Sequence, residues 1–166
     1  MKFLQSLFYL FLITFNLNNP VYSSDVTKGK ELSVSCAACH GDNGISLNPT
    51  WPKLAGQNPK YLASQLYEFK KGPEGNRNNA VMYGIAMTLS DSDIEDLAAY
   101  YASLKSNVGL TQDKYLDLGR NIYRGGNMEI KMQACISCHG PNGQGNYAAA
   151  IPMLSGQHSQ YTYQQL

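Results

Sequence analysis

The stretches Cys36-Ala37-Ala38-Cys39-His40 and Cys135-Ile136-Ser137-Cys138-His139 decide how this chain of 166 residues is interpreted. Together they contain all four cysteines and two of the three histidines of the sequence. Two thiols three positions apart on a helical turn can reach the two vinyl groups along one haem edge. The histidine that follows then directs its imidazole at the iron, which is typical of covalent c-type haem attachment. We therefore predict two covalently bound haem c groups, with these cysteines and axial ligands: Cys36, Cys39, Cys135, Cys138, His40 and His139.

Three other uses of the Cys-x-x-Cys pairs compete with haem attachment. A structural zinc site would have to assemble four thiolates from two distant segments and would leave both histidines unused. A thioredoxin-like redox pair needs a strand–helix–strand context, and the sequence shows no such pattern. Two small disulfides suit an oxidising compartment, but they do not explain the histidines. Haem attachment is the interpretation that uses every residue of both motifs.

The sequence repeats itself around the two motifs. Residues 36–44 (CAACHGDNG) return at 135–143 (CISCHGPNG), and residues 52–57 (PKLAGQ) return at 152–157 (PMLSGQ). Self-similarity of this kind predicts two copies of one structural unit. The helix signal breaks where Ser, Asn and Gly follow Lys105. We expect a signal peptide at 1–23, a first domain at 24–105, a linker at 106–112 and a second domain at 113–166.

Helical patterns dominate both copies. Ser90 and Asp93 form a predicted capping box, after which apolar residues recur at helical spacing from Ile94 to Leu104. The predicted fold class is all-α, with two tandem cytochrome c-like domains, each a small helical fold wrapped round a covalent haem. The second copy stops at Leu166, which corresponds to Leu66, so the second domain is expected to be incomplete. We favour a truncated sequence over a naturally short protein.

The sixth iron ligand of the first unit is expected from one of two methionines. Met82 and Met87 both precede the helix that starts at Ser90. A thioether opposite histidine favours ferrous iron and raises the reduction potential. Either methionine could instead fill a gap in the core.

The N-terminus has the pattern of an export signal. Lys2 precedes an apolar run at 3–17, and Val21 and Ser23 fit the small-residue pattern of a cleavage site. The alternative is a retained membrane anchor, but the run is short for a span and lacks a basic flank. We therefore expect a periplasmic protein. The net charge of +1 gives no indication of nucleic-acid binding.

Longer matches make the chain resemble the dihaem cytochrome c4 family of bacterial periplasmic electron carriers. They are CAACHG (36–41), WPKLAGQ (51–57), LSDSDIEDLAAYY (89–101), RGG (124–126) and GQH (156–158). The resemblance implies His–Met ligation of each iron and selects Met82, seven residues before Leu89, with Met87 as the alternative. It also implies that the carbonyls of Pro52 and Pro152 accept hydrogen bonds from the axial imidazoles. Gly29 and Gly119 resemble the glycines at which the first helix of each unit crosses the last.

The function implied by the resemblance is electron transfer between respiratory-chain partners, without enzymatic activity. The expected donor is a quinol-oxidising complex or another redox protein, the expected acceptor is a terminal oxidase, and peripheral membrane association is left open. One alternative is a cytochrome subunit of a flavin dehydrogenase. Another is a haem enzyme or sensor with an open second haem, because Met153 and His158 are expected to be surface residues and not ligands.

Overall fold

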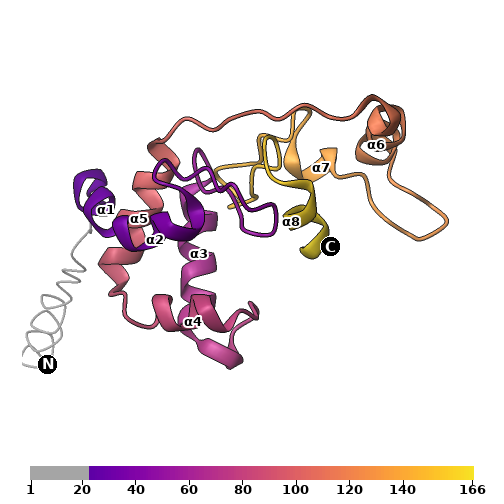
Figure 1. Ribbon diagram of the computed structural model, residues 1–166. Coiled ribbons are helices and arrows are strands. Elements are labelled where there is room, and N and C mark those ends of the chain that lie inside the picture. The colour runs from indigo at the N-terminus through magenta and orange to yellow at the C-terminus, as the bar shows by residue number, and fades with distance from the viewer. Residues whose placement is uncertain (1–22) are drawn as a thin grey trace, which may run out of the picture.

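The computed structural model describes residues 23–166, so the signal peptide expected at 1–23 lies almost wholly outside the described residues. This part of the chain is helical and has no named strand, which confirms the all-α prediction (Figure 1). Two isolated bridges, Asn127–Met132 and Asn146–Ile151, are its only extended pairings. The helices in chain order are α1 (Val26–Leu32), α2 (Val34–His40), α3 (Pro59–Lys70), the 3₁₀ turn η1 (Gly72–Glu74), α4 (Ala80–Ala86), α5 (Asp91–Ser103), α6 (Asp113–Gly125), α7 (Ile136–His139) and α8 (Ser159–Gln164).

The core of the first unit lies where α1 and α3 pack against α5. Gly29 in α1 lies against the backbone of Asp96 in α5, so closely that a Cβ would overlap the Asp96 carbonyl oxygen. The backbone N–H of Asp25 also donates to Asp96 Oδ1 at 2.6 Å, which fixes the start of α1 on α5. The buried apolar side chains of this core are Leu62, Ala63, Ile94, Leu97, Ala98, Tyr100 and Tyr101.

Side-chain caps define where the helices of the first unit begin. Ser90 and Asp93 form the predicted capping box at the start of α5. Asn58 caps α3 ahead of Pro59, whose missing N–H costs nothing at the first helical position. Asn79 caps α4, a two-turn helix that was not predicted from the sequence.

The second unit repeats the first around its motif. In both units the N–H groups of a leucine and the next residue donate to a glycine carbonyl: Leu54 and Ala55 to Gly44 O, Leu154 and Ser155 to Gly143 O. Both glycines have positive φ, 71° and 68°, a conformation that side chains disfavour. Figure 1 shows α7 and α8 lying beside the first unit, whereas α6 lies apart at the end of an extended segment. No residue of α6 is buried.

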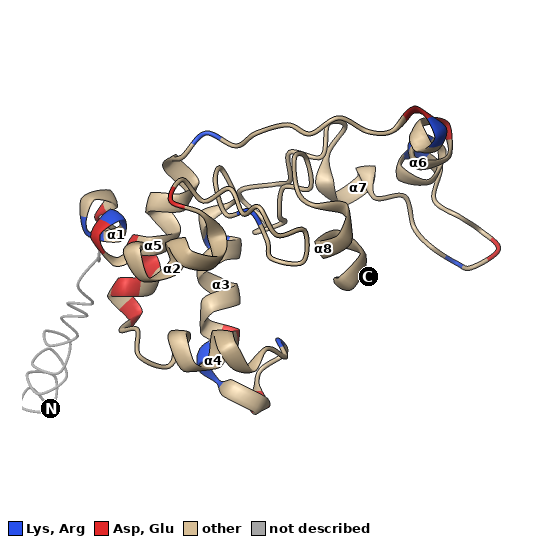
Figure 2. Ribbon diagram, viewed as in Figure 1, with Lys and Arg blue, Asp and Glu red and all other residues tan. Residues whose placement is uncertain are grey.

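Charge is unevenly spread over the described residues. Figure 2 shows acidic positions gathered along α5, whereas α7 and α8 carry neither acidic residues nor Lys or Arg. Within residues 23–166, no helix combines the length and apolarity that a bilayer crossing requires.

Candidate functional site

The first motif is presented by α2 and ends with it. Cys36 and Cys39 lie about one turn apart on this helix, and both are half-buried free thiols. His40 is the last helical residue, and Gly41 ends the helix at a φ of 79°. A Cβ at Gly41 would lie 2.5 Å from the carbonyl oxygen of Ile45, so this turn also needs a glycine for space. The helix thus presents two thiols and one imidazole from adjacent turns.

The imidazole of His40 is fixed by a backbone carbonyl. Its Nδ1 lies 2.8 Å from Pro52 O, and because a carbonyl can only accept, Nδ1 carries the proton. Nε2 is then the nitrogen with a free lone pair, as a metal-ligating histidine requires. Burial lowers the pKa of His40, and the bond to the Pro52 carbonyl raises it by less. The neutral form, which is the one that binds metals, is therefore favoured.

The second motif has the same arrangement in a more exposed setting. His139 ends α7, and its Nδ1 lies 2.8 Å from Pro152 O. Tyr123 of α6 donates to Gly140 O at 2.5 Å and so holds the turn after the motif. Burial, and secondarily the proximity of Cys135, raises the pKa of Tyr123, which keeps this phenol protonated as a donor. The hydrogen bond from imidazole to proline carbonyl is thus present in both units.

The donor set fits haem better than it fits a free metal ion. All four cysteines are free thiols in the structure. Among residues 23–166, no three side chains of His, Cys, Asp or Glu come together in a group that could hold a metal ion. Tetrahedral zinc needs four such ligands at one point. Each unit instead offers two thiols for thioether bonds and one orientated imidazole, which is the set that a covalent haem requires.

The two candidate methionines of the first unit differ in burial. Met82 is half-buried in the first turn of α4, where its N–H donates to Asn79 Oδ1. Met87 follows the last turn of α4, and 63% of it is exposed.

Two residues treated as surface positions lie between the units instead. His158 is half-buried, and its Nε2 donates to Ser46 O at 2.9 Å, so its interpretation as an exposed histidine is wrong. Met153 is half-buried in the same interface, where its backbone bonds to Gln57.

Polar residues that were not predicted as functional from the sequence join the two units. Gln57 and Gln157 each bond to the backbone of the opposite unit, and buried Asn58 donates to Asn146 O and Ile151 O. Both glutamines occupy the same place in the repeat, and that was the available signal. A glutamine carries no redox chemistry of its own, so the repeat alone did not identify its role.

Comparison with known proteins gives one family. A family model described as cytochrome c matches residues 26–105 and 124–166. The chain is 41% identical over 162 residues to cytochrome c4 of Azotobacter vinelandii, covering 93% of this chain and 77% of that protein. It is 38% identical over 139 residues to a thiosulfate dehydrogenase electron acceptor of Thiomonas intermedia, covering 81% of this chain and 62% of that protein.

A solved structure agrees with these relatives. The crystal structure of reduced recombinant cytochrome c4 from Pseudomonas stutzeri superposes with a TM-score of 0.82 at 43% sequence identity. The match covers 86% of this chain and 78% of that chain. The similarity therefore extends over both units and includes their relative placement.

Proposed function

Because the chain belongs to the cytochrome c4 family of dihaem electron carriers, we propose that it carries electrons in the periplasm toward a terminal oxidase. The two haem c groups of this family supply one-electron chemistry, since each iron cycles between the ferric and ferrous states. The protein's own part is to attach the groups, to orient their ligands and to bring its two units together. The carrier needs no substrate pocket, and the family is not enzymatic.

The residues we assign to the haems are those of the two motifs. Cys36, Cys39, Cys135 and Cys138 would form the thioether bonds to the two haems, and His40 and His139 would each hold one iron. The observation that carries this assignment is the 2.8 Å contact from each Nδ1 to a proline carbonyl. This contact leaves Nε2 of each ring available to iron and holds the plane of the ring.

Met82 is our proposed sixth ligand for the first haem. It lies in the first turn of α4 and is half-buried, whereas Met87 is exposed. A soft thioether at this position would raise the potential into the range of a respiratory carrier. The two-domain division at 24–105 and 113–166 follows the same assignment, with one motif in each unit.

Export is also part of the proposal. Covalent haem attachment and electron delivery to a membrane oxidase both fit a periplasmic location, which the predicted signal at 1–23 would provide. The family includes periplasmic and membrane-associated members.

A second candidate function is to receive electrons from a dehydrogenase partner. The observation in its favour is the 38% identity with a thiosulfate dehydrogenase electron acceptor. The two functions differ only in the donor, because the same two-haem fold serves both.

The test is a spectroscopic and kinetic study of the protein purified from the periplasm. Two haems per chain by alkaline pyridine assay and rapid oxidation by oxidase-containing membranes would support the carrier. A protein without covalent haem would overturn the site assignment. Reduction by a quinol-oxidising complex, but not by a thiosulfate dehydrogenase, would favour the respiratory donor over the dehydrogenase partner.

A further inference from the structure

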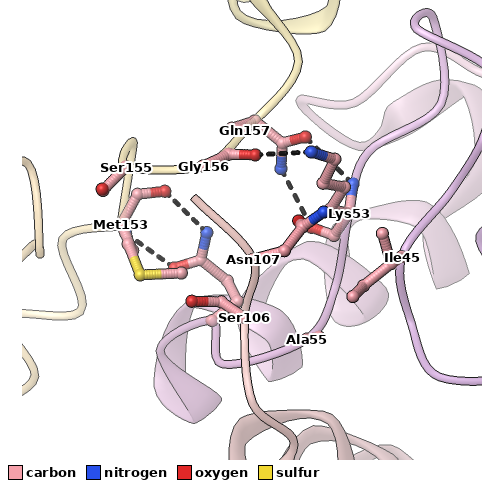
Figure 3. A pocket seen from close by; sticks show the side chains of 10 residues that line it. Ile45, Lys53, Ala55, Ser106, Asn107, Met153, Ser155, Gly156 and Gln157 are labelled. Atoms are coloured by element: carbon pink, nitrogen blue, oxygen red, sulfur yellow. Dashed lines mark hydrogen bonds between the residues drawn. The ribbon is translucent and has the colours of Figure 1, made fainter. Parts of the chain in front are cut away.

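One peptide group in each unit is hydrogen-bonded on both sides. The carbonyl of the Pro52–Lys53 peptide accepts from His40 Nδ1 at 2.8 Å, and its N–H donates to Gln157 Oε1 at 2.9 Å. Gln157 belongs to the other unit. Figure 3 shows Gln157 and Lys53 facing each other across the gap between the two chain segments, joined by dashed lines.

The same arrangement occurs in the opposite direction. The carbonyl of the Pro152–Met153 peptide accepts from His139 Nδ1 at 2.8 Å, and its N–H donates to Gln57 Oε1 at 2.7 Å. Each candidate iron ligand is thus connected, through one peptide group, to a glutamine of the opposite unit.

The two glutamines are held firmly in this orientation. Gln157 Nε2 donates back to Lys53 O, and Gln57 Nε2 donates back to Met153 O, both at 2.9 Å. Each Oε1 also accepts the next backbone N–H of its own chain segment, from Asn58 and His158. Every amide atom therefore has a partner, and Gln57 is only 5% exposed. Hydrogen bonds in such a poorly hydrated place polarise one another more than they do in water.

We propose that Gln57 and Gln157 are positioning residues that act across the interface, each tuning the axial histidine of the other unit. The inference rests on the proposed assignment of His40 and His139 as iron ligands. An acceptor on a peptide N–H makes the carbonyl of that peptide a better acceptor. The carbonyl then takes a stronger hydrogen bond from Nδ1, which raises the basicity of the imidazole toward iron. A more basic ligand stabilises the ferric state and lowers the reduction potential.

This crossed connection has a specific consequence. Docking of the two units changes both ligands at once, because neither glutamine can reach its peptide when the units separate. A substitution in one unit therefore acts on the haem of the other, which no contact within a single unit would produce.

The experiment uses the full-length protein with both haems bound and the variants Gln157→Met, Gln157→Glu and Gln57→Met. The imidazole Nδ1–H signals of the reduced protein are followed by NMR, and the two potentials by spectroelectrochemistry. Gln157→Met is expected to move the His40 signal upfield and to raise the first potential, with His139 unchanged. Gln57→Met should move the His139 signal upfield and raise the second potential, with His40 unchanged. Gln157→Glu keeps an acceptor, and a stronger one. Because Gln157 is only half-buried, water can solvate the second carboxylate oxygen, so the His40 signal should move downfield.

A matched control is Lys53→Met, which introduces the residue of the second unit at its counterpart in the first. It removes the 2.8 Å bond from Lys53 Nζ to Gly156 O and leaves the glutamines in place. Both Nδ1–H signals should stay where they are. The proposal is overturned if each glutamine variant moves only the histidine of its own unit, or if Gln157→Glu behaves like Gln157→Met. Absence of covalent haem in the unmodified protein would instead refute the proposed function.

Discussion

Gly29 and Asp96 approach so closely that a single methyl group would not fit between α1 and α5. Tyr100 Cβ closes the same space at 2.8 Å from the position that a Cβ would occupy. Two of the three neighbours are backbone atoms, which cannot rotate away. The glycine therefore sets how near the two helices can lie, and with it the position of α2 and its motif.

Replacing Gly29 by alanine should lower the free energy of unfolding by about 1–3 kcal/mol, the usual cost of overpacking a well-packed contact. Gly119, the counterpart in α6, provides the control, because no described atom lies within 4 Å of a Cβ there. Alanine at this helical site should be neutral or stabilise by up to about 1 kcal/mol. Urea unfolding of both variants measures the difference. Equal destabilisation by the two substitutions would mean that α6 is also closely packed in solution.

The sequence predicted the parts of this fold that depend on local signals. The capping box at Ser90 and the helix that follows it came from residue types and spacing, whereas the closeness of Gly29 to a helix was implied by the resemblance to the cytochrome c4 family. Helix α4 was missed because it is only two turns long and its cap, Asn79, follows an asparagine-rich stretch that is typical of a loop. Helix propensity alone does not identify a short helix, because most of the stability of a helix in a protein comes from tertiary packing.

The interface between the two units was also not predicted, and the reason is a different one. The bonds of Gln57 and Gln157 join segments about a hundred positions apart, and their geometry exists only when both units are folded. His158 was misinterpreted on the same ground, since its partner is the Ser46 carbonyl in the other unit. The repeat identified these residues as equivalent without indicating that they would meet.

Met82 and Met87 should be separable by spectroscopy. Met82→Ala is expected to abolish the charge-transfer band of methionine-ligated ferric haem in the first unit and to lower its potential, because a thioether ligand favours ferrous iron. Met87→Ala should change neither, since this side chain is largely exposed. Visible spectra and redox titrations of the two variants give the answer. An unchanged band in Met82→Ala would return the ligand role to Met87.

The capping box of α5 should make stability depend on pH. Hydrogen bonds from Ser90, first through its side chain and then through its backbone N–H, lower the pKa of Asp93. A carboxyl group with a lowered folded-state pKa contributes stability above its unfolded pKa and loses it as the pH falls through the folded value. The unmodified protein should therefore lose more stability than Asp93→Asn between about pH 6 and about pH 3, around the ordinary carboxyl range.

Ser90→Ala tests the other half of the same capping box. It should cost about 1 kcal/mol at neutral pH, the typical value for losing an N-cap side chain. It should also reduce the pH dependence, since one cause of the lowered Asp93 pKa is removed. Urea unfolding at about pH 6 and about pH 3 tests this prediction. A Ser90→Ala protein with unchanged acid sensitivity would show that other carboxyl groups dominate the acid response.

Asn58 allows the interface to be tested apart from the helix that it caps. Its Oδ1 accepts from Lys60 N and Tyr61 N at the start of α3, and its Nδ2 donates across the interface to Asn146 O at 3.0 Å. Asn58→Asp keeps the capping oxygen and places a second carboxylate oxygen against that carbonyl. Because the side chain is 0% exposed, the repulsion is not relieved by water. We expect the two units to separate while α3 stays folded.

The readout for Asn58→Asp is limited proteolysis of the segment at 104–112, which joins the units and should be cut several times faster when they separate. Asn79→Asp is the matched control, because it makes the same change at an exposed N-cap, that of α4. An aspartate at an exposed N-cap is as good as asparagine and interacts favourably with the helix dipole. The control should therefore leave the cutting rate unchanged. Equal protection in both variants would mean that the glutamine pairs hold the units together without Asn58, and faster cutting in both would attribute the effect to added negative charge.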